Sequence, residues 1–128
     1  MAKLIDVDNL TEHMRAFCEE RAWGQFHTPK NLALALTGEV GELCAELQWL
    51  SEDEASADGM SAEKKATVAA ELADVTIYLV QLADRLAVDL DRAVQTKMEL
   101  NARRYPVAES YGSAAKAKPL PEDQTGSV

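Results

Sequence analysis

The stretch "HTPKNLALALTGEVGELCAELQWL", residues 27–50, predicts one long helix. Thr28 is a favourable N-cap, and Pro29 follows at the first helical position, where its missing N–H costs nothing. Apolar residues recur at steps of three and four up to about Leu50, which is the period of an amphipathic helix; they are Leu32, Leu36, Val40, Leu43, Leu47 and Leu50. Gly38 and Gly41 interrupt this pattern, and each costs about 0.5–1 kcal/mol relative to alanine. A helix that keeps both needs space beside its backbone.

Three further helices are expected, each beginning at a residue that can cap it. A loop around Gly24 separates the first from the second, and Tyr105-Pro106 ends the last, because proline disfavours helix in the residue before it. Residues 75–83 are apolar almost all round, so we expect more than the helix's own chain to bury them. The expected ranges are 9–21 after Asp8, 62–86 after Ser61 and 90–104 after Asp89.

The chain is therefore expected to be all-α, a four-helix bundle over residues 1–106 with a flexible tail over residues 107–128. No alternating strand pattern or internal repeat is present in the sequence. Residues 107–128 are rich in Ala, Ser, Lys, Pro and Gly and show no helical period.

Composition narrows the class of protein. The 128 residues suit a single domain, and 47% of them are hydrophobic. The net charge of −9 argues against a nucleic-acid binder, which needs a basic face. The two cysteines have no metal-binding spacing. The N-terminus turns acidic too early for a signal peptide, and no apolar run approaches the length of a membrane span. We expect a soluble, cytoplasmic protein.

Four carboxylates share one spacing on the two longest expected helices. Glu39 and Glu42 each follow a glycine and lie three residues apart, and Glu71 and Asp74 repeat that spacing. If the two apolar stripes pack together, the four like charges meet and need a cation. Hard oxygen ligands suit Mg²⁺ or Mn²⁺ rather than zinc. Exposed glutamate pairs are common on solvated helices, so one pair alone would carry little weight.

The motifs resemble the MazG-like all-α nucleoside triphosphate pyrophosphohydrolases. "GEVGEL" followed by "ELADV" is similar to the ExxE…ExxD motif of that family. "RAWGQFHTPKNLALALTGEVGELCAELQW" and "KMELNARRYP" extend the resemblance to the dCTP pyrophosphatase branch, over residues 10–106. The resemblance implies Mg²⁺-dependent hydrolysis of a nucleoside triphosphate to its monophosphate and pyrophosphate. It also implies a homodimer or homotetramer with sites near subunit interfaces.

The resemblance assigns roles by position. Glu39, Glu42, Glu71 and Asp74 would hold the metal, and Glu42 is our choice for the base that orients water. The residues matching those around the base in the dCTP branch are Trp23, Gly24, Gln25, Phe26, His27, Trp49 and Tyr78. Aromatic faces of this kind stack on nucleobases. Met14 stands where mammalian-type members have a histidine, which argues against strict cytosine selectivity.

Spacing alone suggests a phosphate contact. Two cations and an amide fall on one face of the last expected helix, at Lys97, Asn101 and Arg104. The alternative is a solvated last turn that complements the helix dipole.

Two other functions remain open. One is a pyrophosphatase of different specificity, such as dUTP or a non-standard nucleoside triphosphate. The other is a non-enzymatic helical module whose acids bind a structural metal.

Overall fold

The computed structural model describes residues 5–117, 119 and 120, and its regular elements are all helical, as predicted. No strand occurs among these described residues. In chain order the elements are α1 (Val7–Glu20), the 3₁₀ turn η1 (Trp23–Gln25), α2 (Pro29–Leu47), α3 (Ala62–Arg85), α4 (Leu90–Arg104) and α5 (Val107–Ser110).

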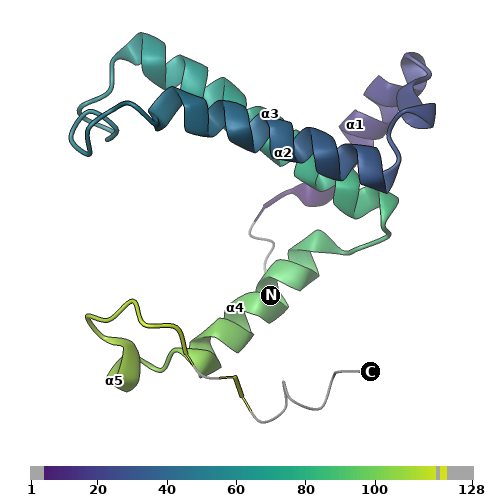
Figure 1. Cartoon of the computed structure of the whole chain (residues 1–128). Helices are drawn as coiled ribbons and strands as arrows, with labels where there is room; N and C mark the ends of the chain where they lie inside the picture. Colours follow the sequence, from purple (N-terminus) through teal and green to yellow (C-terminus); the bar gives the residue numbers. More distant parts are fainter. Residues whose placement is uncertain (1–4, 118, 121–128) are drawn as a thin grey trace. The chain divides into compact units, whose positions relative to one another are not determined.

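The chain divides into two compact units, residues 1–90 and 91–128. In the first unit α2 and α3 lie side by side as a helical hairpin, and α1 packs against α3 (Figure 1). The second unit contains α5 and all of α4 beyond its first residue.

The predicted caps hold the hairpin at both of its helix starts. The Thr28 hydroxyl accepts a hydrogen bond from the Asn31 amide at 3.2 Å, with Pro29 at the first helical position. The Ser61 hydroxyl accepts from the Lys64 amide at 3.1 Å. Lys64 Nζ also lies 2.7 Å from Glu46 Oε2, so an ion pair joins α2 to α3 beside the connecting loop.

Several helix ends differ from the sequence expectation. α1 begins at Val7, because Asp6 rather than Asp8 supplies the cap by accepting from the Asn9 amide at 3.0 Å. α2 ends at Leu47 and not at Leu50. The short helix α5 lies at the start of the predicted tail, just after Pro106. Residues 118 and 121–128 of that tail lie outside the described part of the chain.

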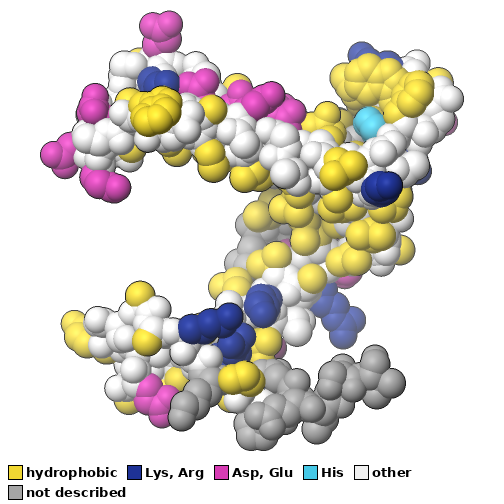
Figure 2. All heavy atoms as spheres, in the orientation of Figure 1, with side chains coloured by type: hydrophobic (Ala, Val, Ile, Leu, Met, Phe, Trp, Pro, Cys, Tyr) yellow, Lys and Arg dark blue, Asp and Glu magenta, His cyan; other side chains and the backbone are white. Residues whose placement is uncertain are grey.

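Few side chains of the first unit are buried. The buried apolar residues among those described are Cys18, Leu32, Val80 and Ala83. Large apolar side chains of α2 and α3 stay exposed, including Leu34 at 63% and Leu72 at 51%. Figure 2 shows apolar side chains along the α2–α3 pair, with carboxylates gathered on another part of it. The hairpin therefore leaves much of its apolar surface uncovered.

One helix is more apolar than the sequence expectation allowed. α3 has 24 residues and contains an 18-residue window of mean hydropathy 1.4, which meets the length and composition of a membrane span. The expectation that no segment does so is wrong, because Val, Ile and Leu outweigh the two carboxylates in the average. Core helices of soluble proteins have the same composition. Carboxylates such as Glu71 and Asp74 are rare within membrane spans.

Candidate active site

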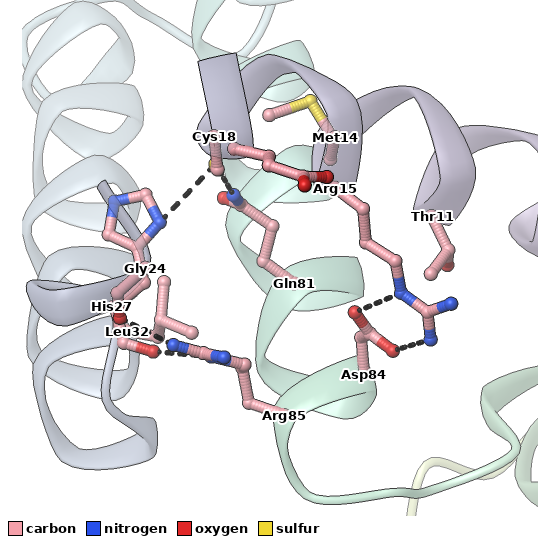
Figure 3. A pocket seen from close by; sticks show the side chains of 11 residues that line it. Thr11, Met14, Arg15, Cys18, Gly24, His27, Leu32, Gln81, Asp84 and Arg85 are labelled. Atoms are coloured by element: carbon pink, nitrogen blue, oxygen red, sulfur yellow. Dashed lines mark hydrogen bonds and ion pairs between the residues drawn. The ribbon is translucent and has the colours of Figure 1, made fainter. Parts of the chain in front are cut away.

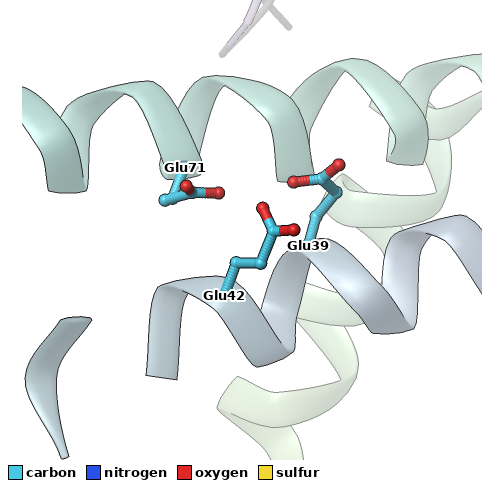
Figure 4. A group of neighbouring side chains, drawn as sticks. All are labelled: Glu39, Glu42 and Glu71. Atoms are coloured by element: carbon cyan, nitrogen blue, oxygen red, sulfur yellow. The ribbon is translucent and has the colours of Figure 1, made fainter. Parts of the chain in front are cut away.

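Three of the four predicted metal ligands meet between α2 and α3. Glu39 and Glu42 come from α2 and Glu71 comes from α3, and one carboxylate oxygen of each lies within 4.8 Å of the others. Figure 4 shows the three side chains converging on the space between the two helices. The i, i+3 spacing on α2 explains why its two glutamates share one face.

Two oxygens of this cluster lack any partner among the described residues. Glu39 Oε2 and Glu71 Oε2 are buried without a hydrogen bond. Unpaired buried carboxylate oxygens are costly, and a bound cation would satisfy them. The donor set is made of hard oxygens, which fits a divalent metal ion of the Mg²⁺ or Mn²⁺ type.

The same crowding changes the proton affinity of the cluster. Burial, followed by the charge and a hydrogen bond of Glu42, raises the pKa of Glu39 to about 6. Burial and then the charge of Glu42 also raise the pKa of Glu71. Asp74 lies outside the group of three, but its charge contributes to raising both pKa values. The four predicted acids thus act on one another, as repelling like charges do.

The two glycines beside the ligands are not required by the fold of the chain. A Cβ atom built on Gly38 or on Gly41 would meet nothing within 4 Å. The mid-helix glycines therefore leave open space next to Glu39 and Glu42.

The predicted base loop forms a compact turn between α1 and α2. Trp23, Gly24 and Gln25 make up η1, and Phe26 and His27 follow it. The Trp23 ring meets Phe17 edge to face at 5.6 Å between centroids and His27 at 6.1 Å. His27 is half-buried and Trp23 is 41% exposed, so the turn offers part of its aromatic surface to solvent.

A cavity of about 260 Å³ opens beside this loop. Met14, Cys18 and His27 line it, together with Gln81 and Arg85 from α3 (Figure 3). Cys18 Sγ lies 3.5 Å from His27 Nδ1 and accepts a hydrogen bond from Gln81 Nε2 at 3.2 Å. Met14, whose position marks the departure from the mammalian-type pattern, thus shares a cavity with a predicted base contact.

The other two aromatic residues lie elsewhere on the hairpin. Trp49 follows the end of α2 and is 87% exposed, whereas Tyr78 is half-buried on α3. α2 has 19 residues, so its length is about 28 Å at the helical rise of 1.5 Å per residue. Trp23 and Trp49 flank opposite ends of this helix. One chain does not bring these two tryptophans to a single base.

The predicted phosphate contacts belong to the second unit. Lys97 and Asn101 are exposed on α4, and Arg104 is half-buried near its end. Arg104 Nε is buried without a hydrogen-bond partner among the described residues, and its guanidinium lies 5.9 Å from the centre of the Tyr105 ring.

Sequence reasoning missed the contacts that join α3 to the loop and to α1. Arg85 donates to two loop carbonyls, and Arg15 of α1 forms an ion pair with Asp84. Neither arginine belongs to a motif or a periodic pattern. Arg85 resembles any basic residue in a last helical turn, so its partners could not be found from spacing.

Comparisons with known proteins identify the family of the chain. A family model described as MazG-like matches residues 37–120, which include α3 and the glutamate-bearing half of α2. The chain belongs to the MazG-like family. It resembles a crystal structure of a pyrophosphatase from Archaeoglobus fulgidus at 36% identity and a TM-score of 0.71, covering 83% of this chain and 97% of that one.

Curated relatives are more similar in sequence. The chain is 50% identical over 109 residues to dCTP pyrophosphatase 1 of Bos taurus, covering 85% of this chain and 64% of the relative. It is 50% identical over 105 residues to dCTP pyrophosphatase 1 of Homo sapiens, covering 82% and 62%. The chain thus spans less than two thirds of the length of these relatives.

Proposed function

We propose that this protein is a nucleoside triphosphate pyrophosphohydrolase that converts dCTP or a modified dCTP, with water, to the monophosphate and pyrophosphate. The observation that carries the proposal is the glutamate cluster, in which two buried carboxylate oxygens have no partner within the described part of the chain. The similarity to dCTP pyrophosphatases supports the choice of nucleotide.

Glu39, Glu42, Glu71 and Asp74 hold the metal, with Mg²⁺ preferred and Mn²⁺ as a substitute. A divalent ion bound there polarises phosphoryl oxygens and lowers the pKa of a bound water. Glu42 orients the attacking water and accepts its proton. Glu42 suits this role because its side chain, unlike those of Glu39 and Glu71, is exposed. The space beside Gly38 and Gly41 admits the triphosphate.

The base is held by Trp23, Tyr78 and Trp49, with His27 as a hydrogen-bonding group and the backbone of Gly24–Phe26 shaping the loop. Because Trp23 and Trp49 flank opposite ends of α2, which is about 28 Å long, we assign the two to different subunits around one base. A homodimer or homotetramer is the assembly that supplies them. The exposed apolar surface of α2 and α3 supports such an interface.

Lys97, Asn101 and Arg104 bind triphosphate oxygens from α4. Guanidinium and ammonium groups form strong charge-assisted hydrogen bonds to phosphate, which the net charge of −9 would otherwise repel. We place the reaction in the cytoplasm, where the free thiols of Cys18 and Cys44 would persist.

A panel of deoxynucleoside triphosphates tests this function by the release of pyrophosphate. We expect release from dCTP with Mg²⁺, measurable but slower release from dUTP and dTTP, and none with EDTA. Met14→His should narrow the range toward dCTP. Faster release from dUTP or from a non-standard purine triphosphate would replace the proposed substrate. No release from any triphosphate would leave the metal-binding module as the function.

A further inference from the structure

Arg85 ties the predicted base loop to α3. Its Nε donates a hydrogen bond to the His27 carbonyl at 2.8 Å, and its Nη2 donates to the Gly24 carbonyl at 2.5 Å. One guanidinium therefore binds two carbonyls of the loop, one before Gln25 and one after Phe26 (Figure 3). A planar fork of donors makes this double contact possible, whereas an ammonium group is a single point of attachment.

The loop needs such a tether because its own backbone is strained at the entry. Ala22, the residue before η1, has a φ of 53°, in the left-handed region that is unfavourable for a residue with a Cβ. The internal hydrogen bonds of the loop are short-range, such as the Phe26 amide to the Trp23 carbonyl at 2.9 Å. Contacts from outside must stabilise this conformation.

The ring of His27 has a separate attachment. Cys18 of α1 lies 3.5 Å from His27 Nδ1, and Gln81 of α3 donates to the same sulfur. Arg85 thus fixes the backbone at Gly24 and His27, while Cys18, which accepts a hydrogen bond from Gln81, contacts the His27 side chain. Among the described residues, the Trp23 side chain has ring contacts with Phe17 and His27 but no hydrogen bond, so its position depends in part on the backbone that Arg85 holds.

We propose that Arg85 is a positioning residue that fixes the Trp23–His27 loop in the conformation that receives the base. This inference rests on the proposed function. α3 also carries Glu71 and Asp74, so a single helix holds acids of the metal centre and the anchor of the loop. Arg85 touches no reacting atom in this proposal and acts only through the loop.

The test begins without substrate, so that it does not depend on the reaction. Trp49→Phe leaves Trp23 as the only tryptophan, and its fluorescence is then measured with acrylamide as quencher. In that background Arg85→Lys keeps the charge but loses the fork. We expect a higher quenching constant with helical circular dichroism unchanged. Lys64→Ala is the matched control, because it removes an ion pair between α2 and α3 at the end of the hairpin away from the Trp23–His27 loop.

The second arm uses the chain with both tryptophans. Arg85→Ala, which loses both hydrogen bonds to the loop, should raise KM for the preferred triphosphate about tenfold and leave kcat within about twofold. Arg85→Lys should not restore the wild-type KM, whereas Lys64→Ala should keep it. If residue 85 acted by its positive charge alone, lysine would replace arginine without a rise in KM.

The possible results separate the two claims. Unchanged Trp23 quenching in Arg85→Lys overturns the positioning role, whatever the activity. Altered quenching with an unchanged KM also overturns it, because the loop would then move without affecting the base. Altered quenching in a protein that hydrolyses no triphosphate leaves Arg85 as the anchor of the loop and removes the proposed function.

Discussion

The acidic cluster and the aromatic loop differ in how far the chain satisfies their polar groups. In the cluster, two buried carboxylate oxygens have no partner among the residues that the structure describes, the pKa of Glu39 is raised to about 6, and the glycine positions face open space. In the loop, Arg85 donates to two carbonyls, and the His27 ring contacts Cys18. Within the described part of the chain, the cluster keeps unpaired oxygens, whereas the loop has hydrogen-bond partners on α3.

This difference indicates separate roles for the two regions. A bound cation would relieve the repulsion among the carboxylates, so we expect the chemistry to take place there. A loop whose backbone is already tethered loses less entropy when a ligand arrives. Substitutions in the cluster should therefore affect the rate of reaction, and substitutions around the loop should affect the choice and affinity of the base.

The largest effect is expected from Glu42→Gln. If Glu42 accepts the proton of the attacking water, kcat should fall about 10²–10⁴-fold, which is the range for loss of a general base. Glu46→Gln is the matched control, because Glu46 lies one turn further on α2 and pairs with Lys64. Pyrophosphate release by the two variants, with circular dichroism of each, makes the measurement. Equal activity of both would remove the assigned role of Glu42.

A smaller loss is expected from Trp49→Ala. Base stacking is worth roughly 1–3 kcal/mol, so kcat/KM should fall by about ten- to a hundredfold with unchanged Mg²⁺ dependence. Because we assign Trp23 and Trp49 of one site to different subunits, a mixture of Trp23→Ala and Trp49→Ala should regain activity after subunit exchange. For a dimer, random exchange of an equal mixture would leave up to about a quarter of all sites with both tryptophans intact. No recovery in exchanged subunits would place both tryptophans outside a shared site.

Substitution of Gly38 or Gly41 should change stability and activity in opposite directions. Gly38→Ala or Gly41→Ala should stabilise the helix by about 0.5–1 kcal/mol, because the new Cβ meets no described neighbour within 4 Å. The same Cβ should lower activity if the space beside the ligands admits the triphosphate. Thermal unfolding and pyrophosphate release are measured together, with Ala45→Gly as a control that should lower stability alone. A stabilised variant with full activity would mean that the space is not used.

The smallest effect concerns pH in the metal-free protein. Glu39 has a folded-state pKa of about 6, above its ordinary value of 4.5, so the folded state binds this proton more tightly. The resulting stability is fully present below about pH 4.5 and is lost as the pH rises through about 6. Melting temperatures in EDTA should therefore fall over this range more steeply for wild type than for Glu39→Gln. Parallel curves would contradict the raised pKa.

Sequence reasoning reached the helices and the cluster because both depend on local spacing. The caps at Thr28 and Ser61 and the i, i+3 pair at Glu39 and Glu42 are set by residues a few positions apart. Sequence reasoning did not recognise that Trp23 and Trp49 of one chain are too far apart to contact the same base, although the length of α2 already implies this. The two hydrogen bonds from Arg85 to the loop join residues that are 58 and 61 positions apart in the sequence, and no local sequence pattern predicts them.

Metal binding is the most direct test of the central claim that the cluster of Glu39, Glu42 and Glu71 holds a divalent ion. Free Mn²⁺ is followed by electron paramagnetic resonance during titration of wild type, Glu71→Gln and the control Glu46→Gln. We expect wild type and Glu46→Gln to bind alike and Glu71→Gln to bind at least about tenfold more weakly. Equal Mn²⁺ affinity in all three proteins would contradict the account.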